Sequence, residues 1–472
     1  MATRQKKIAV VMTHGIGEQY PMETLTSFVQ AAWVENKDVQ WKPPGDEKAD
    51  DIWFKPDDPV TGSNELRRIT TRWTEGHGPR VDFFEFYWAD LAEGATVEEV
   101  WDWLRTLLWR PLSRVPPGVT GAWLLLWFVT LVIGGLSIAA VLPWPGAWWH
   151  ALLAAAAAAV AYGMQYVVTP YAGDVARYVR ADPRNIAMRR AIRERGLKLL
   201  TELHKCGSYE RIIFVAHSLG TIVAYDLVSL LWTMRQDALL MYEGSPAFER
   251  LREVEAAAHA LDANNSEQAR AAYRNAQRRF RLELRSGGAD GAGAQRKSDD
   301  EWLISDLITL GSPLTHAQFL MVHDQVALNE RIERWWYSTN PPQFQQIDSE
   351  QRDKINDRPN PPAPPEVMGP PGGLFSFFFS KPGLWSMHHA APFAAVRWTN
   401  IFDPHRWIFF GDIISGPLAD VFGHGITDID LRDLRGPAKG FSHTRYWSLE
   451  EGPDAAPIKA LQQAINLLDK EQ

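Results

Sequence analysis

The chain has 472 residues, with 49 Lys and Arg against 57 Asp and Glu, which gives a formal net charge of −8. This acidic balance argues against a nucleic-acid-binding protein, which would need a basic surface. Charged residues make up 22% of the chain and apolar residues 46%, ordinary values for a globular protein that exclude wholesale disorder. The single cysteine, Cys206, excludes an intramolecular disulfide and fits a reducing compartment.

The first predicted element is a buried strand at Lys7–Thr13. It is rich in β-branched residues and leads into a glycine-rich segment, HGIG, at residues 14–17. Too few apolar residues precede His14 to form the core of a signal peptide, so we expect no Sec-dependent export. A second strand is predicted at residues 81–88.

No Asp, Glu, Lys or Arg occurs in residues 115–173. One membrane pass needs about 20 apolar residues, so this stretch is long enough for two passes and a turn. We predict an inserted two-helix transmembrane hairpin, with spans at residues 119–142 and 147–168 around a turn at 143–146. Two buried helices in a large soluble core are the alternative. It is less favoured because soluble helices rarely extend beyond about 18 apolar residues without a charge.

Eight of the 21 tryptophans lie between Trp101 and Trp149. Tryptophan concentrates at membrane interfaces because its ring is apolar while its N–H needs a polar partner. Arginines flank both outer ends of the hairpin and none lies in its turn, so the positive-inside rule puts both flanks in the cytoplasm. We therefore expect an integral protein of the inner (cytoplasmic) membrane, with its main domain on the cytoplasmic side.

Downstream of the hairpin, apolar strands alternate with helical segments. Strands are predicted at residues 211–216, 302–310 and 395–402, and helical segments at 174–204 and 219–231. This alternation predicts an α/β fold with a mostly parallel sheet and helices on both faces. Residues 1–114 would form its first part and residues 174–472 the remainder.

Two insertions interrupt this pattern. Residues 236–300 are rich in Ala, Arg and Glu and predict a long polar helix or helix pair followed by a flexible glycine loop. Residues 338–383 hold nine prolines between Pro341 and Pro371, which predict a loop. The phenylalanine-rich run at 375–379 either packs on the body or forms a membrane-dipping patch.

A candidate nucleophile follows the strand at 211–216. The sequence there is Ala216-His217-Ser218-Leu219-Gly220, and a helical segment comes directly after it. Small residues on both sides of a serine allow the sharp strand-to-helix turn that lifts the hydroxyl out of the sheet. The helix N-terminus beneath it favours developing negative charge. A chance serine in such a turn is the alternative, and the strand before and helix after weigh against it.

This motif resembles the nucleophile turn of the α/β-hydrolase family, and in particular of its lipase-like members. Ala216 stands where the usual motif has glycine. The resemblance implies an α/β-hydrolase-like fold and a catalytic triad in the chain order Ser, Asp or Glu, His. Ser218 would be acylated and then released by water.

The resemblance also points to the base and the acid. His443, in the segment FSHTRYW, resembles the histidine loop of lipase-like members, with His424 as a rival and a solvated loop histidine as the ordinary alternative. Asp412, in GDIISGPL, resembles the family's acid loop better than Asp403, in FDPHR, does. Asp403 has another explanation, because an aspartate before Pro404 can cap a strand end. Both aspartates stay candidates, and Asp412 is favoured.

An oxyanion hole needs two backbone N–H groups. One is expected from Leu219, directly after the nucleophile, and the other from Ile16, because the HGIG segment resembles the HG-x-G loop of lipases. A glycine-rich phosphate loop is the competing interpretation, but a lone GxG is weak support for it. His388 and His389 have no cysteine or carboxylate at metal-ligand spacing, so neither a metal nor a cofactor is expected.

These features predict a membrane-anchored serine hydrolase that cleaves an ester by a Ser218–Asp412–His443 triad. The hairpin would hold the site near acyl chains, so the expected partners are the bilayer and a lipid or other acyl-ester substrate. A thioesterase or protein deacylase is the alternative enzyme, because the same triad cleaves either ester. A non-catalytic, hydrolase-like membrane scaffold is the alternative from another class.

Overall fold

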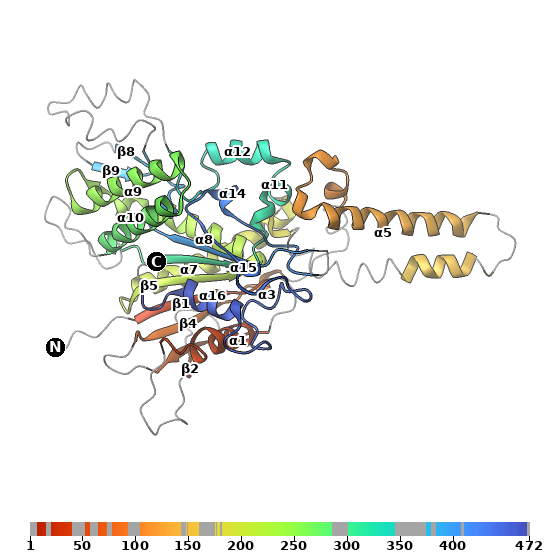
Figure 1. Cartoon of the computed structure of the whole chain (residues 1–472), viewed down its shortest axis with the longest axis horizontal. Coiled ribbons are helices and arrows are strands. Elements are labelled where there is room, and N and C mark those ends of the chain that lie inside the picture. Colours follow the sequence, from red (N-terminus) through yellow and green to blue (C-terminus); the bar gives the residue numbers. More distant parts are fainter. Residues whose placement is uncertain are drawn as a thin grey trace.

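The structure is a computed structural model of the chain, shown in Figure 1. It describes residues 7–15, 20–39, 52–56, 65–72, 78–92, 104–142, 148, 150–159, 175, 177–179, 182–285, 301–344, 374–378, 384–406 and 410–469. Within these residues, helices cover a central sheet and one long helix projects from the body (Figure 1).

The central sheet has eight strands in the order β11-β10-β7-β5-β1-β4-β3-β2. Their bounds are β1 (Lys7–Thr13), β2 (Ile52–Pro56), β3 (Arg67–Thr71), β4 (Val81–Phe86), β5 (Tyr209–His217), β7 (Ile304–Leu310), β10 (Arg397–Phe402) and β11 (Thr427–Asp430). The six strands from β11 to β4 are parallel, and β3 runs antiparallel to both β4 and β2. The predicted α/β class with a mostly parallel sheet is therefore confirmed.

Each of the five predicted strands is present: Lys7–Thr13 has the predicted bounds, and no end of the other four is shifted by more than two residues. The sequence interpretation missed β2, β3 and β11, because these strands are short and carry polar or charged residues. In β11, for example, all four residues are half-buried, and Asp428 and Asp430 interrupt any apolar pattern.

Alternation along β1 explains why both sheet faces are covered. Ala9 and Val11 belong to one apolar cluster, whereas Ile8, Val10 and Met12 belong to another on the opposite face. The first cluster includes side chains from α7 (Ile186–Lys205), α8 (Leu219–Arg235), α9 (Pro246–Ala263) and α10 (Glu267–Arg285). The second includes side chains from α1 (Glu23–Val29), the π-helical turn η1 (Gln30–Val34), α15 (Leu431–Arg435) and α16 (Ala456–Ile465). Helices thus pack on both faces, as expected for a buried parallel sheet.

Shorter helical segments connect these elements. They are α3 (Ala89–Ala92), η2 (Leu112–Arg114), η3 (Pro183–Asn185), η4 (Gln236–Leu239), η6 (Pro313–His316), α11 (Ala317–Leu320), α12 (Gln325–Glu333), η7 (Pro392–Ala394) and α14 (Ala419–Phe422).

The predicted insertion at 236–300 contains a helix pair, α9 and α10, and its residues 286–300 lie outside the described part of the chain. The pair is amphipathic, with its apolar side chains in the main core. Phe248 and Leu251 of α9 and Tyr273 and Phe280 of α10 are all buried there. Their burial makes the pair a part of the folded body.

The expectation of a loop throughout 338–383 is wrong at one point. Ser376–Phe378 forms β8, which pairs antiparallel with β9 (Leu384–Met387), and β9 pairs with β6 (Met241–Tyr242) to complete a small sheet. This stretch contains no proline, so its N–H groups remain available, and the Glu255 carboxylate accepts from the N–H groups of Phe375 and Ser376. Phe375 is fully buried against the body, while residues 345–373 lie outside the described part.

Among the described residues, one helix is long and apolar enough to cross a membrane. This is α5 (Pro117–Val141), in which Pro117–Ala140 is the candidate span. An 18-residue window of this span has a mean hydropathy of 2.2, and none of its residues is buried. It projects from the body on the side away from the N-terminus (Figure 1). Of the expected second span at 147–168, only a shorter apolar helix, His150–Ala159, is described, and residues 160–168 lie outside the described part. The two-span hairpin therefore stays a prediction.

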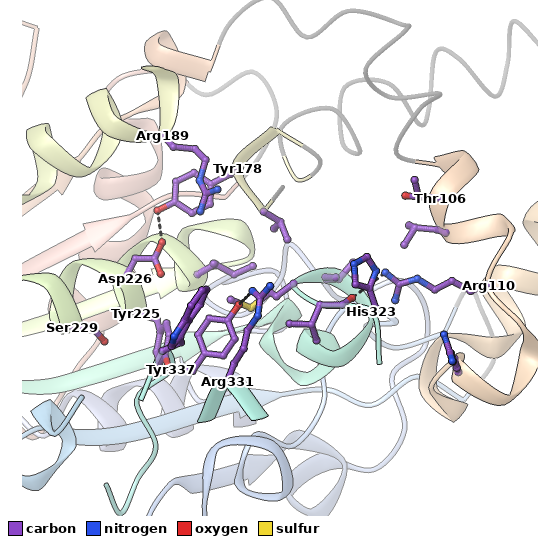
Figure 2. A pocket seen from close by; sticks show the side chains of 18 of the residues that line it. Thr106, Arg110, Tyr178, Arg189, Tyr225, Asp226, Ser229, His323, Arg331 and Tyr337 are labelled. Carbon is purple, nitrogen blue, oxygen red and sulfur yellow. Dashed lines mark hydrogen bonds between the residues drawn. The ribbon is translucent and has the colours of Figure 1, made fainter. Parts of the chain in front are cut away.

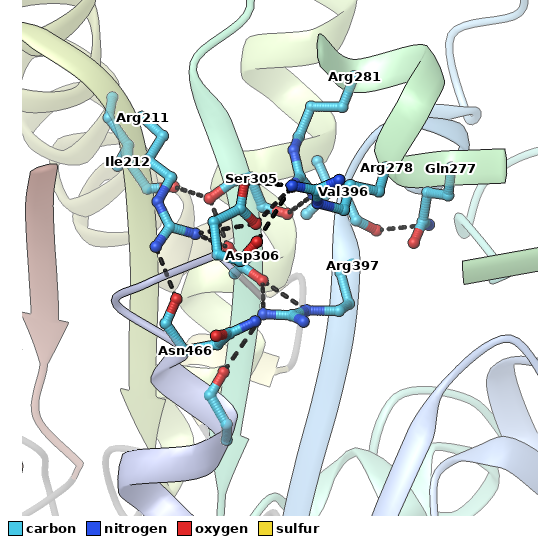
Figure 3. A network of polar contacts seen from close by, with 12 residues as sticks. Arg211, Ile212, Gln277, Arg278, Arg281, Ser305, Asp306, Val396, Arg397 and Asn466 are labelled. Atoms are coloured by element: carbon cyan, nitrogen blue, oxygen red, sulfur yellow. Dashed lines mark hydrogen bonds and ion pairs between the residues drawn. The ribbon is translucent and has the colours of Figure 1, made fainter. Parts of the chain in front are cut away.

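A buried ionic network lies at the amino ends of three neighbouring strands (Figure 3). The Asp306 carboxylate on β7 accepts from Arg397 Nε of β10 at 2.6 Å and lies 3.6 Å from Arg211 Nη1 of β5. Arg211 Nη2 also donates to the carbonyl of Asn466, just after α16, at 2.7 Å. Burial alone would raise the pKa of Asp306, but Arg397, Arg281 and Arg211 together hold it below its ordinary value.

We expect Asp306→Asn to lower the free energy of unfolding by about 3–5 kcal/mol, because it leaves buried arginines without their carboxylate. Asp454→Asn is the matched control, since Asp454 pairs with Lys37 and Lys459 on the exposed surface. Thermal unfolding of the purified protein in mild detergent measures both. If the network does not stabilise the fold, Asp306→Asn and Asp454→Asn will have the same unfolding temperature.

Candidate active site

Ser218 lies on a sharp turn between β5 and α8. Its backbone has φ 53° and ψ −130°, a region that L-residues rarely adopt, and α8 begins at the next residue. The turn is held by the Ser218 N–H, which donates to the carbonyl of Leu310 at the end of β7. The side chain therefore leaves the sheet at the carboxyl edge of the parallel strands, with the N-terminus of α8 beside it.

Two glycines allow this turn to approach the end of β1. A Cβ atom at Gly220 would overlap the carbonyl oxygen of His14, and a Cβ at Gly15 would lie 2.7 Å from Ser218 Cβ. Neither position has room for a side chain, since real Cβ atoms almost never come within 3.0 Å of another heavy atom. Gly15 of the HGIG segment and Gly220 of the AHSLG segment thus allow the same close contact between the end of β1 and the start of α8.

The structure brings Ser218, His443 and Asp412 together in a chain of hydrogen bonds. Ser218 Oγ lies 2.8 Å from His443 Nε2, and His443 Nδ1 lies 2.9 Å from Asp412 Oδ2. All three side chains are buried, with Ser218 3% and His443 7% exposed. A carboxylate that accepts from Nδ1–H leaves the Nε2 lone pair directed at the serine hydroxyl, which is the tautomer that a general base needs.

Asp412 is held in place by further donors. Tyr446 Oη donates to Asp412 Oδ2 at 2.7 Å, and the N–H of Ile414 donates to Asp412 Oδ1 at 2.9 Å. Burial acts to raise the pKa of Asp412, but the hydrogen bonds from His443, Tyr446 and Ile414 bring it below its ordinary value. The carboxyl therefore stays ionised and can stabilise a positive charge on His443.

Asp403 and His424, the alternative candidates for the acid and the base, make other contacts. Asp403 Oδ2 accepts from Arg435 Nη2 at 2.6 Å, and its carbonyl accepts from the N–H of Asp412, so Asp403 shapes the loop that carries Asp412. Burial raises the pKa of Asp403. His424 lines a separate cavity of about 390 Å³ with Pro341 and Phe344.

Three residues support the triad without being predicted to do so. His217 Nε2 donates to the carbonyl of His443 at 2.7 Å, and burial lowers the pKa of His217 to about 3, so its ring is neutral. Gly311 has φ +60°, and a Cβ atom at this position would lie only 2.7 Å from Tyr446 Cε2 and 3.1 Å from Asp412 Oδ2. Its lack of a side chain therefore leaves room for both residues. The third is Tyr446. These contacts join residues far apart in the chain, so only the tyrosine had a local sequence signal, in the RYW that follows His443.

The expected oxyanion donors are described in part. Leu219 is the first residue of α8, and the N–H of a first helical residue has no partner within its own helix. Ile16 lies outside the described residues, so its assignment stays a prediction. The preceding residues are fixed by His14, which accepts from the Trp88 N–H at Nε2 and donates from Nδ1 to the carbonyl of Gly15 at 2.8 Å.

Among the described residues, no group of three or more His, Cys, Asp or Glu side chains is arranged to hold a metal ion. His388 and His389 bond instead to backbone carbonyls of Gln343 and Trp335. Comparison of the chain with protein-family models, curated proteins and solved structures gives no match in any of the three. A functional assignment therefore depends on the geometry of the site itself.

Proposed function

We propose that the chain is a membrane-anchored serine hydrolase of the α/β-hydrolase type that cleaves a carboxylic ester, with a lipid as the favoured substrate. One observation carries this proposal: the hydrogen-bonded chain from Ser218 Oγ through His443 to Asp412, with distances of 2.8 and 2.9 Å, beginning on a strained strand-to-helix turn. This combination is the arrangement by which a serine hydroxyl becomes a nucleophile.

The order of the residues supports the same class. Ser218 follows β5 in the middle of the parallel strands, Asp412 follows β10, and His443 follows β11. Enzymes of the α/β-hydrolase type use this order, with the nucleophile on a turn between a strand and a helix. Asp412 is buried and its pKa lies below the ordinary value, so its carboxylate also fits the role of an orienting acid.

In the proposed mechanism, Ser218 Oγ attacks the ester carbonyl carbon while its proton passes to His443 Nε2. The negative oxygen that develops is held by the Leu219 N–H and a second donor from the HGIG segment. The bond to the alcohol then breaks as Nε2 returns the proton to the departing oxygen. Water attacks the acyl-enzyme with the same proton transfers, which releases the acid and restores Ser218.

The lipid assignment rests on the apolar helix α5. Val119 and Trp123 of its first turns pack against an apolar cluster of Leu107, Val115 and Phe319, which joins the helix to the body. If α5 and the predicted second span cross the membrane, they hold the Ser218 site near acyl chains and raise their effective concentration.

The catalytic assignment predicts covalent labelling of Ser218. A fluorophosphonate probe should label the folded wild-type protein and should leave Ser218→Ala unlabelled, because the probe forms a bond only to an activated serine oxygen. Labelling is read by mass spectrometry of the peptide that contains residue 218. A wild-type protein that resists the probe, or a Ser218→Ala protein that still reacts, would exclude the serine-hydrolase proposal.

The two aspartates should differ in their effect on turnover. Asp412→Asn should lower kcat for a soluble ester by up to about 10⁴, because His443 loses its orienting partner and takes the wrong tautomer. Asp403→Asn is the matched control and should lower kcat far less, since Asp403 bonds to Arg435. Steady-state kinetics at saturating ester measure both. The reverse ranking would contradict the proposed role of Asp412.

Membrane insertion predicts a depth-dependent response to charge along α5. The double variant Phe128→Arg/Leu131→Arg places two charges at the helix centre, where each costs about 2.5–3.5 kcal/mol on insertion scales. It should be lost from membranes washed with alkaline carbonate. The control Leu112→Arg/Leu142→Arg adds the same charge near the helix ends, where arginine reaches the interface, and should be retained. Equal retention of both variants would argue against a spanning α5.

A further inference from the structure

A cavity of about 840 Å³ lies outside the candidate active site, at the base of α5 (Figure 2). Its walls come from the segment Thr106–Arg114, from α7 and α8, and from the chain around α11 and α12. Ser218, Asp412 and His443 are not among its lining residues. The volume is typical of cavities that bind small molecules, so the lining residues indicate what it can hold.

Among the described residues that line the cavity, positive charge is in excess. They include one carboxylate, Asp226, and five guanidinium groups, those of Arg110, Arg114, Arg189, Arg193 and Arg331. Asp226 is already engaged, since it accepts from Arg193 Nη2 at 2.6 Å and from Tyr178 Oη at 2.9 Å. Arg114 lies 3.6 Å from Asp324. Among the described residues, no carboxylate forms an ion pair with the other three arginines.

Aromatic rings and hydrogen-bond acceptors position two of these arginines, Arg110 and Arg331. The Arg110 guanidinium stacks 4.7 Å above the Phe319 ring and donates from Nη2 to the Val322 carbonyl at 3.0 Å. The Arg331 guanidinium lies 5.2 Å from the Trp336 ring and donates to Tyr337 Oη at 3.1 Å. Such contacts orient a cation without neutralising its charge.

Two of these arginines each have one nitrogen for which the described part of the chain provides no hydrogen-bond partner. Arg110 Nη1 and Arg189 Nε are buried and have no hydrogen-bond partner among the described residues. Burial lowers the pKa of both side chains, which reflects the unfavourable solvation of their charge. An anion bound in the cavity would compensate the charge of these guanidinium groups, as phosphate does beside arginine.

The place of the cavity identifies the kind of anion. Trp109, which is 72% exposed, lines the cavity and contacts Trp127 of α5 with ring centroids 6.0 Å apart. Trp127 and Trp123 each donate an indole N–H to a carbonyl of the segment before α5, at Leu108 and Leu107. Tryptophans near the base of a membrane span are typical of the interface between bilayer and water. The arginines therefore lie beside the base of α5, within reach of the headgroup of a membrane lipid, provided that α5 crosses the bilayer as proposed above.

We propose that this cavity binds the phosphate-containing headgroup of an anionic membrane phospholipid, with Arg110 and Arg331 as its principal ligands. The headgroup phosphate enters between the base of α5 and the α12 region, and the acyl chains follow the apolar surface of α5. The bound lipid is a structural ligand that holds the body at the membrane, distinct from the ester that Ser218 would cleave.

Binding is tested on the purified full chain carrying Ser218→Ala in an uncharged detergent. This protein lacks the nucleophile and is not in a bilayer, so the result is independent of both hydrolysis and membrane crossing. Isothermal titration calorimetry is performed with dioctanoyl phosphatidylglycerol, dioctanoyl phosphatidylcholine and inorganic phosphate. We expect the phosphatidylglycerol to bind at least tenfold more tightly than the phosphatidylcholine, and inorganic phosphate to bind more weakly still because it lacks the apolar contacts.

Arg110→Gln and Arg331→Gln, each added to Ser218→Ala, should weaken phosphatidylglycerol binding at least tenfold. Arg279→Gln is the matched control, because it removes the same charge from α10 at a side chain that pairs with Glu253 of α9 on the surface. An unchanged unfolding temperature without lipid shows that a variant is folded. Two cavity variants are used so that the test still holds if one of them does not fold. Equal affinity for both lipids, equal loss in the control, or inorganic phosphate binding as tightly as phosphatidylglycerol would overturn the proposal.

Discussion

The close contact between the end of β1 and the start of α8 is the constraint on which the site depends. Gly15 and Gly220 let two backbone segments approach to a distance that no side chain permits. This contact fixes Ser218 in its strained conformation, because relaxing the turn would move α8 away from β1. A third glycine, Gly311, removes the obstacle at the end of β7 so that the acid and the histidine can reach the turn.

Opposite ends of the same strands carry the ionic network and the site. Arg211, Asp306 and Arg397 lie at the amino ends of β5, β7 and β10, and the loops from the carboxyl ends of these strands carry the candidate nucleophile, Gly311 and Asp412. The network links the amino ends of these three strands through charged side chains. Because parallel strands transmit a shift along their whole length, an ordered network at one end positions side chains at the other.

Local patterns were sufficient to predict the five longer strands and to single out Ser218, because a nucleophile turn needs particular small residues at fixed offsets. The resemblance then pointed to His443 and favoured Asp412 over Asp403. Non-local features were not predictable. The Asp306 network joins four elements that spacing does not relate, and β2, β3 and β11 lack a clear apolar pattern. The choice between Asp403 and Asp412 also needed the fold. Their positions in the sequence do not show that Asp403 bonds to Arg435 and Asp412 to His443.

In the proposed arrangement, the chain between β4 and α7 would give the body two different means of contact with a membrane. A single apolar helix would leave the body free to rotate about the helix axis. Here the segment before α5 packs on Phe319 and also presents Arg110 to a cavity beside the helix, so an apolar and an electrostatic contact lie at separate points. With a lipid headgroup bound in that cavity, rotation of the body would break the electrostatic contact. The proposed lipid would therefore set the direction in which the Ser218 site faces the bilayer.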